Sequence, residues 1–300
     1  MQHRPTLKQL QYLVTLAEME HFGAAAERCF VTQSTLSAGI RELENLLGAP
    51  VAERSNRQVL MTPLGRRLAE RAAVLLRDAD DLVDMARAER RPLGGDLHLG
   101  VIPTVSPFLL PKVLPTLARR FPELRLYLRE EQTEPLLDRL RKGAIDVALI
   151  AFPYSSSGFA TDIVMEDEFL FACAADHPYA DLDTVSLASL SSEPLMLLEE
   201  GHCLRGHTLE ICALGRQQLR VQFEASSLHT LVQMVASGIG VTLIPKLAVE
   251  AGITEGTNIV VSPMRSPAAR QLGLIWRQQS LRTDEYRLLG EALRSLVPEA

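Results

Sequence analysis

The sequence predicts an α/β protein in three consecutive parts, and three patterns support this prediction. Apolar residues recur at helical spacing through residues 7–47, which predicts a small helical module. A heptad-like pattern covers residues 63–91 and predicts one long helix. From residue 96 onward, short apolar strands alternate with helices, as in α/β folds that contain a parallel sheet.

Composition and charge limit what the chain can do. A length of 300 residues exceeds one ordinary domain, and 47% hydrophobic with 23% charged residues is typical of a globular protein. No apolar run approaches the roughly 20 residues of a membrane helix, and the N-terminus lacks a signal-peptide core. We therefore expect a cytoplasmic protein without a membrane partner, in which the four cysteines are thiols. Because the net charge is −6, any contact with DNA must be local.

The first 62 residues predict three short helices and a hairpin. Leu7, Leu10, Val14 and Ala17 recur at helical spacing, and residues 23–26 supply small side chains to a second helix. Thr32 is placed to cap a third helix, which ends at Gly48. The apolar face of this third helix comprises Leu36, Ile40, Leu43 and Leu47.

The opposite face of the third helix carries Gln33, Ser37 and Arg41, which suit base edges and phosphates in a major groove. Residues 51–61 alternate as a hairpin, whose tip places Arg54 and Arg57 on the phosphate backbone. Spacing alone is a weak signal for a helix-turn-helix, and on that basis a small helical bundle with a solvated face is the favoured alternative.

Residues 6–65 resemble the winged helix-turn-helix of LysR-type transcriptional regulators. The matching residues are Phe22, Ala25-Ala26, Gln33, Ser34, Leu36, Ser37, Ile40, Leu43-Glu44, Leu47-Gly48, Glu53-Arg54, Arg57 and Thr62-Pro63-Leu64-Gly65. The resemblance implies double-stranded DNA with inverted-repeat half-sites as a partner. The DNA-binding residues it implies are Thr32, Gln33, Ser34, Ser37, Arg41, Arg54 and Arg57. Ala24 stands where the family often has Arg, so the phosphate contact of that position does not carry over.

Residues 63–91 predict a long linker helix that begins with Thr62 as cap and Pro63 at the first helical position. Its heptad seam comprises Leu68, Ala72, Leu75, Ala79, Leu82 and Ala86. Because the helix lies between domains and symmetric dimers read DNA half-sites, we expect this seam to dimerise the chain. The alternative is a helix face that packs on its own domain. Residues 90–95 then break the helix and mark a domain boundary.

From residue 96 to residue 151, three strands alternate with two helices. We expect strands at 97–101, 124–128 and 145–151, with helices at 106–120 and 134–142. Thr104 and Thr133 therefore follow neighbouring strand ends, where small polar ligands bind in open α/β sheets. The simpler alternative is that both threonines only cap helices.

A second unit covers residues 166–267, with strands near 169–173, 195–198, 221–223 and 241–244 and a helix capped at Ser226. Residues 268–300 return with a strand at 272–276 and a terminal helix. Two such subdomains resemble the effector-binding half of LysR-type proteins, which is similar to periplasmic binding proteins. The expected domains are a winged helix-turn-helix (1–62), a linker helix (63–91) and a regulatory domain (92–300). Its α/β subdomains are I (92–165 and 268–300) and II (166–267).

The segment Gly201-His202-Cys203-Leu204-Arg205, followed by Cys212, carries the chemistry. Cationic neighbours and a helix N-terminus favour the thiolate of Cys203, and a second thiol nearby is typical of a peroxide sensor with a resolving cysteine. If one helix joined Cys203 to Cys212, their Cα atoms would lie roughly 13 Å apart. A disulfide needs less than about 7 Å, so oxidation must rearrange this backbone.

A narrower resemblance, to the OxyR group of peroxide sensors, covers nearly the whole chain. It rests on residues 102–107, Glu131-Gln132-Thr133, 200–205 with Cys212, and Arg270 before Gly273-Leu274. It implies that Cys203 is the peroxidatic thiol, that Cys212 resolves it as a disulfide, and that the pocket comprises Thr104, Thr133, His202, Arg205 and Arg270. It further implies an activator without cofactor or enzymatic activity. Its partners would be hydrogen peroxide, DNA, RNA polymerase and further copies of the chain, as a homodimer that assembles to a homotetramer.

One departure and three alternatives accompany this resemblance. OxyR proteins commonly have Asp directly after the Arg, where this chain has Gly206, which would alter peroxide reactivity. A LysR-type regulator of a small organic anion, with incidental cysteines, fits the same cleft, and a thiol peroxidase fits the same thiols. Zinc is a further alternative, with His202, Cys203, His207 and Cys212 as ligands, although their spacing lacks a CxxC pair. Cys29 and Cys173 are expected to be buried, inert thiols.

Overall fold

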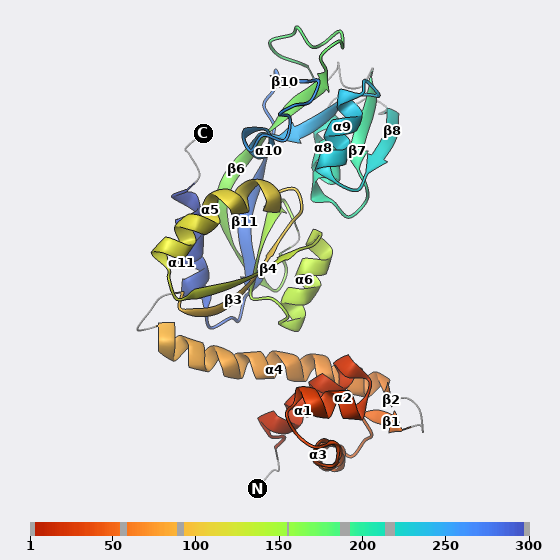
Figure 1. Ribbon diagram of the computed structural model, residues 1–300, viewed down its shortest axis with the longest axis vertical. Helices are drawn as coiled ribbons and strands as arrows, with labels where there is room; N and C mark the ends of the chain where they lie inside the picture. The colour runs from red at the N-terminus through yellow and green to blue at the C-terminus, as the bar shows by residue number, and fades with distance from the viewer. Residues whose placement is uncertain are drawn as a thin grey trace. The chain divides into compact units, whose positions relative to one another are not determined.

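The computed structural model describes residues 4–54, 59–88, 93–154, 156–186, 193–213 and 220–296 (Figure 1). The chain divides into two compact units. The first holds the described part of residues 1–89 together with residues 142–144, and the second holds the rest.

The N-terminal unit consists of helices and one small hairpin. Its elements are α1 (Leu7–Met19), α2 (Phe22–Arg28), α3 (Gln33–Leu47), β1 (Ala52–Arg54), β2 (Val59–Met61) and α4 (Pro63–Ala88). The predicted limits of α3 are confirmed, because the Thr32 hydroxyl accepts a hydrogen bond from the Thr35 backbone and Gly48 ends the helix at φ +69°. The antiparallel pair β1–β2 confirms the predicted hairpin, whose tip at residues 55–58 lies outside the described residues.

The predicted apolar faces of α1 and α3 are correct only in part. In α1 the buried residues are Tyr12, Leu13, Thr15 and Leu16. Leu10, Val14 and Ala17 of the predicted face are partly buried, and Leu7 is 55% exposed. The reason is that α1 packs against three helices, α2, α3 and α4, so that more than one of its faces is covered. In α3, Leu47 is 37% exposed, although the earlier residues of its predicted face are buried.

The second unit is a mixed α/β domain. In chain order its first elements are β3 (Gly95–Val101), α5 (Ser106–Arg120), β4 (Leu124–Glu130), α6 (Thr133–Lys142), β5 (Val147–Phe152), β6 (Phe159–Ala174), β7 (Pro194–Leu198) and α8 (Cys203–Ala213). They are followed by β8 (Arg220–Ala225), α9 (Leu228–Ala236), β9 (Thr242–Pro245), α10 (Lys246–Glu250), β10 (Ile259–Pro263), β11 (Ala269–Arg277) and α11 (Thr283–Arg294).

The expected parallel sheet is correct only in part. Strands β3, β4 and β5 are parallel, and so are β7 and β8 in a separate two-stranded sheet. The main sheet has the order β10-β6-β11-β5-β3-β4, with β9 also paired to β6, and β6 and β11 run antiparallel to their neighbours. Strand alternation could not show this, because β11 returns from subdomain II and enters the sheet from the opposite end.

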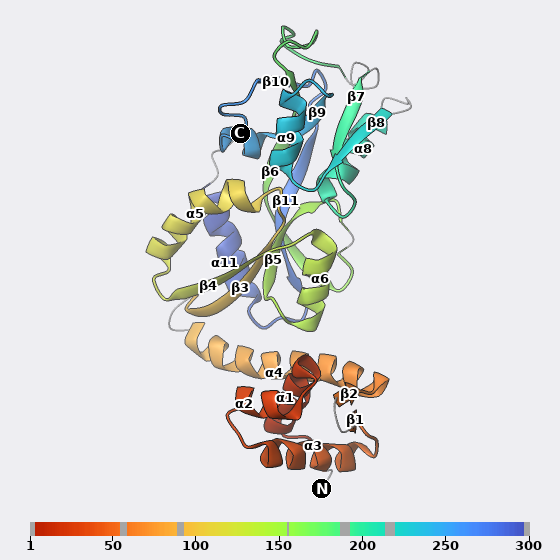
Figure 2. The same ribbon diagram turned by 45° about the vertical axis from the view of Figure 1, so that its right-hand side comes forward.

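Strand β6 extends through residue 166, where the two subdomains were expected to meet. Its first half pairs with β11, and its second half pairs with β9 and β10. The helix cap expected at Ser226 belongs to Ser227, whose hydroxyl accepts a hydrogen bond from the Thr230 backbone. Helix α6 lies on the opposite face of the main sheet from α5 and α11 (Figure 2). None of the helices in the described ranges is long and apolar enough to cross a membrane.

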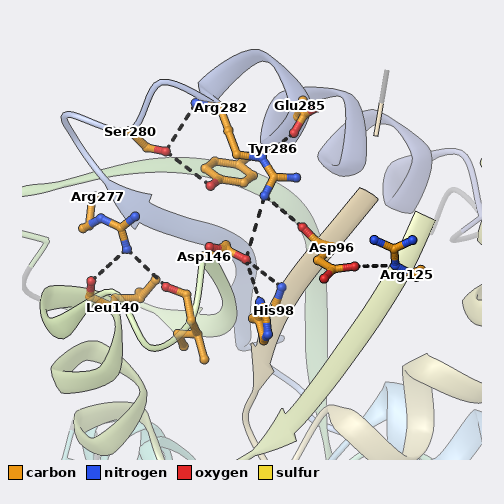
Figure 3. A network of polar contacts seen from close by, with 11 residues as sticks. Asp96, His98, Arg125, Leu140, Asp146, Arg277, Ser280, Arg282, Glu285 and Tyr286 are labelled. Atoms are coloured by element: carbon orange, nitrogen blue, oxygen red, sulfur yellow. Dashed lines mark hydrogen bonds and ion pairs between the residues drawn. The ribbon is translucent and has the colours of Figure 1, made fainter. Parts of the chain in front are cut away.

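A buried polar network fixes α11 to the start of β3 (Figure 3). Arg282, 4% exposed, donates to Glu285 at 2.6 Å and to the Asp96 carbonyl at 3.0 Å. The backbone N–H of His98 donates to Asp146 at 2.7 Å. Because Thr104 follows the other end of β3, this network secures the sheet at the end away from the candidate site.

Candidate redox site and DNA-binding surface

Cys203 is the first residue of α8, as the sequence predicts. The preceding loop turns at Gly201, whose φ of +94° favours glycine. A Cβ atom at Gly201 would collide with the side chain of Gln132, the residue before α6. The loop before Cys203 therefore packs directly against the start of α6. The thiol is free and half-buried, at the N-terminus of α8.

Helix α8 is continuous from Cys203 to Ala213 and therefore includes Cys212. Nine residues of α-helix place the two Cα atoms roughly 13 Å apart. Leu204, Thr208 and Ile211 are buried on α8 at 2%, 2% and 9% exposure. A disulfide between the two positions thus requires the helix to open and these side chains to lose their packing. The side chain of Cys212 lies outside the described part of the chain.

Arg270 is the centre of a buried polar cluster. It donates to the Oγ1 atom of Thr104 at 2.9 Å and to its carbonyl at 3.0 Å. Its Nε donates to Asp167, its cross-strand partner on β6, at 3.0 Å. Asp167 also accepts a hydrogen bond from the backbone of Leu247 at 3.0 Å. All of these groups are at most 5% exposed, so the Arg270 charge is neutralised inside the protein.

The two threonines do not act as the helix caps that the simpler alternative requires. The N-cap of α5 is Val105, and the helix has no side-chain cap, while the Thr104 hydroxyl accepts from Arg270. Thr133 is the first residue of α6, and its Oγ1 atom is buried without a hydrogen-bond partner. Buried hydroxyls are rarely left unpaired, so Thr133 is available for a small ligand.

The predicted pocket residues His202 and Arg205 have partners elsewhere. His202 is 8% exposed and hydrogen-bonds to the backbone of Ser226, and burial lowers its pKa. Arg205 donates to Glu224 at 2.6 Å and to the Leu198 carbonyl at 3.2 Å. The structure therefore brings Thr104 and Arg270 together but does not bring Arg205 to them.

The histidine beside Arg270 is His207, which the sequence suggested only as a zinc ligand. It is 8% exposed, its ring lies 6.3 Å from that of Phe169, and its Nδ1 atom has no hydrogen-bond partner. Burial, and secondly the charge of Arg270, lower its pKa. A helical wheel identifies this position, because residues four apart share one helix face.

Three further neighbours of the site were also missed. Burial, and secondly a hydrogen bond that its hydroxyl donates to Glu134, raise the pKa of Tyr154 to about 12; the charge of Cys203 contributes. The other two neighbours are Gln132, which contacts the loop at Gly201, and Asp167, which pairs with Arg270. No sequence pattern distinguishes Asp167, which is one of three consecutive acidic residues, Glu166, Asp167 and Glu168.

The structure bears on the zinc alternative only through His202, Cys203 and His207, because the side chain of Cys212 lies outside the described part. Within the described residues, no group of three or more His, Cys, Asp or Glu side chains is placed to hold a metal ion. Cys173 is fully buried, which raises the pKa of its thiol, as expected for an inert cysteine. Cys29 ends α2 and is half-buried rather than buried.

The DNA-binding candidates lie along α3. Gln33, Ser34 and Arg41 are exposed, and Ser37 is half-buried with its hydroxyl 3.5 Å from Arg41. The Thr32 hydroxyl serves the helix cap. The strand β1 ends at Arg54, whose side chain lies outside the described part, as does Arg57.

Two family models match the chain. Residues 7–66 match the helix-turn-helix of the bacterial regulatory lysR family, and residues 90–298 match the LysR substrate-binding domain. The chain belongs to the LysR family. Its curated LysR-type relatives include the regulator EstR of Acinetobacter baylyi, 41% identical over 98% of this chain and 97% of that protein. The dual regulator OxyR of Escherichia coli is 39% identical over 96% of this chain and 95% of that protein.

Solved OxyR structures agree with this LysR assignment over the full length. A full-length cysteine-to-aspartate variant of OxyR from Pseudomonas aeruginosa superposes with a TM-score of 0.81 at 35% identity, covering 97% of this chain and 95% of that one. A peroxide-bound cysteine-to-serine variant of OxyR from Corynebacterium glutamicum gives 0.68 at 34% identity, covering 99% and 94%.

Proposed function

We propose that this LysR-family regulator senses hydrogen peroxide, and that a disulfide between Cys203 and Cys212 switches its action on DNA. The observation that carries the proposal is the half-buried, free thiol at the N-terminus of α8, whose preceding loop packs against the residue before Thr133; the Thr133 hydroxyl is buried and unpaired. The relatives named OxyR, one of them peroxide-bound, support the same chemistry.

The reaction proceeds in two balanced steps. The Cys203 thiolate attacks one peroxide oxygen, the O–O bond breaks, and the other oxygen leaves as hydroxide, which takes up a proton to become water. Thr133 and the cluster of Thr104 and Arg270 supply hydrogen bonds to the oxygens. The Cys212 thiol then displaces water from the Cys203 sulfenic acid and forms the disulfide.

The second step requires α8 to open, and this couples the chemistry to conformation. Closing a loop of about ten residues with a disulfide restricts the chain by an entropy equivalent to roughly 2.7 kcal/mol, which opposes oxidation. The packing of Leu204, Thr208 and Ile211 in the reduced form opposes it as well. These two costs make the disulfide easier for a thiol reductant to reverse.

The remaining parts of the proposal concern partners. A homodimer reads inverted-repeat half-sites in the DNA. The residues that contact DNA are Gln33, Ser34, Ser37 and Arg41 on α3, Thr32 at its cap, and Arg54 and Arg57 in the wing. The dimer is held by α4, where Leu75 and Leu82 are 45% and 62% exposed on the predicted seam. Assembly to a homotetramer, contact with RNA polymerase, a cytoplasmic location and the absence of enzymatic turnover belong to the same proposal.

The pairing of Arg270 disfavours the alternative of an organic anion as the signal. Asp167 already neutralises Arg270 at 2.9 Å, so this guanidinium offers an anion no uncompensated charge. Peroxide is neutral and requires only hydrogen bonds.

A brief micromolar pulse of peroxide, followed by peptide mapping without reductant, tests the proposal. We expect a Cys203–Cys212 disulfide within one chain. Cys203→Ser should abolish the response, and Cys212→Ser should trap a sulfenic acid at Cys203. Turnover with excess thiol reductant would favour a peroxidase, and thiols that resist peroxide until zinc is removed would favour a metal site.

A further inference from the structure

The buried ring of His207 holds a hydrogen-bonding atom that the protein itself does not use. His207 is 8% exposed, and its Nδ1 atom has no partner. Buried polar atoms are nearly always satisfied by protein, water or ligand. The unpaired Oγ1 atom of Thr133 is a second such atom in the same unit. The Nδ1 atom of His207 is therefore free to bond a small polar molecule or to carry a proton.

Helix geometry places His207 next to the reactive thiol. Residues four apart on an α-helix have Cβ atoms about 5–6 Å apart, and Cys203 and His207 have this spacing on the unbroken helix α8. The ring of His207 lies against that of Phe169 on β6. The charge of Arg270 on β11 lowers the pKa of His207, and the charge of Glu210 on α8 raises it.

The other proton carriers near Cys203 are already engaged. The Tyr154 hydroxyl donates to Glu134, and the His202 ring hydrogen-bonds to the backbone of Ser226. Gly206 has no side chain, and open space surrounds it. His207 therefore remains as the acid–base group within one helical turn of the thiol.

We propose that His207 transfers the proton in the peroxide reaction, accepting it from the Cys203 thiol and giving it to the departing oxygen. This inference rests on the peroxide function proposed above. The thiol proton moves to the imidazole, the thiolate sulfur bonds one peroxide oxygen, and the O–O bond breaks. The imidazolium then protonates the hydroxide, so that thiol and peroxide become sulfenic acid and water. Burial, and secondly the charge of Arg270, lower the pKa of His207, which favours return of the proton from the imidazolium to the departing oxygen.

The pH profile of the reaction tests this role. The rate of Cys203 oxidation by peroxide should be bell-shaped in wild type, because the reactive thiol–imidazole pair carries one proton. In His207→Gln the profile should rise with thiol ionisation alone, and the rate at neutral pH should fall by about 10²-fold or more. His177→Gln is the matched control, since His177 is also largely buried but pairs with Glu193 at 3.5 Å. It should keep the bell-shaped profile.

Each outcome decides one claim. A wild-type rate that only rises with pH refutes the role of His207 without any variant, so misfolding of His207→Gln leaves the test intact. A bell-shaped profile that persists in His207→Gln also refutes it, while peroxide sensing by Cys203 stands. Failure of wild-type Cys203 to react with peroxide would instead overturn the proposed function.

Discussion

Opening of α8 on oxidation should make the redox equilibrium depend on the packing of Leu204, which is 2% exposed in the reduced form. Leu204→Ala removes buried methyl groups, and such changes typically destabilise by about 2–5 kcal/mol. If α8 is already open in the oxidised form, Leu204→Ala destabilises only the reduced form. A differential of about 2–3 kcal/mol corresponds to a midpoint potential about 40–65 mV more negative, since about 30 mV equals 1.4 kcal/mol in a two-electron couple.

The assay equilibrates the protein in graded thiol–disulfide buffers, traps free thiols by alkylation, and measures the Cys203–Cys212 disulfide by mass spectrometry. Leu231→Ala on α9 is the control, because Leu231 is 1% exposed in the same core but lies outside the helix that opens. It should lower stability in both redox forms and leave the potential unchanged. Equal potentials for wild type and Leu204→Ala would show that α8 stays packed in the oxidised state.

Four further outcomes are expected. Thr133→Val should slow peroxide oxidation roughly ten- to hundredfold by removing one hydrogen bond, and stopped-flow rates should show normal alkylation of the thiol. Arg41→Ala should weaken binding to a selected operator by about 1–3 kcal/mol, as measured by fluorescence anisotropy; unchanged affinity would place the recognition surface elsewhere. Gly201→Ala should lower the free energy of unfolding in urea by about 1–3 kcal/mol, because φ is +94° there. Burial lowers the pKa of His202 and His207, so the unfolded chain binds protons at a higher pH than the folded protein does. The free energy of unfolding should therefore fall as the pH drops below about 6.5. Urea titrations from pH 7.5 to 5 measure it, and a free energy that does not change with pH would contradict the prediction.

Local signals in the sequence predicted the local structure well. Thr32 and Gly48 define α3 through their own chemistry, and Cys203 begins α8 as expected. The polar cluster was not accessible in this way, because Arg270 and Asp167 are 103 residues apart and meet only through the register of β11 on β6. The resemblance to OxyR proteins assigns His202 to the pocket, and this assignment stays a prediction. Helical periodicity adds His207, which lies one turn after Cys203 on the same face of α8.

The unbroken helix between the two cysteines also determines how fast the disulfide can form. After the first thiol is oxidised, its sulfenic acid must wait until α8 opens and brings the second thiol within reach. The opening equilibrium of α8 therefore limits the rate of disulfide formation, and tighter packing of α8 lengthens the lifetime of the sulfenic acid. During that interval a reductant that reaches Cys203 can return it to the thiol. The fraction of oxidised molecules that end as a disulfide therefore depends on the rate of helix opening relative to the rate of reduction.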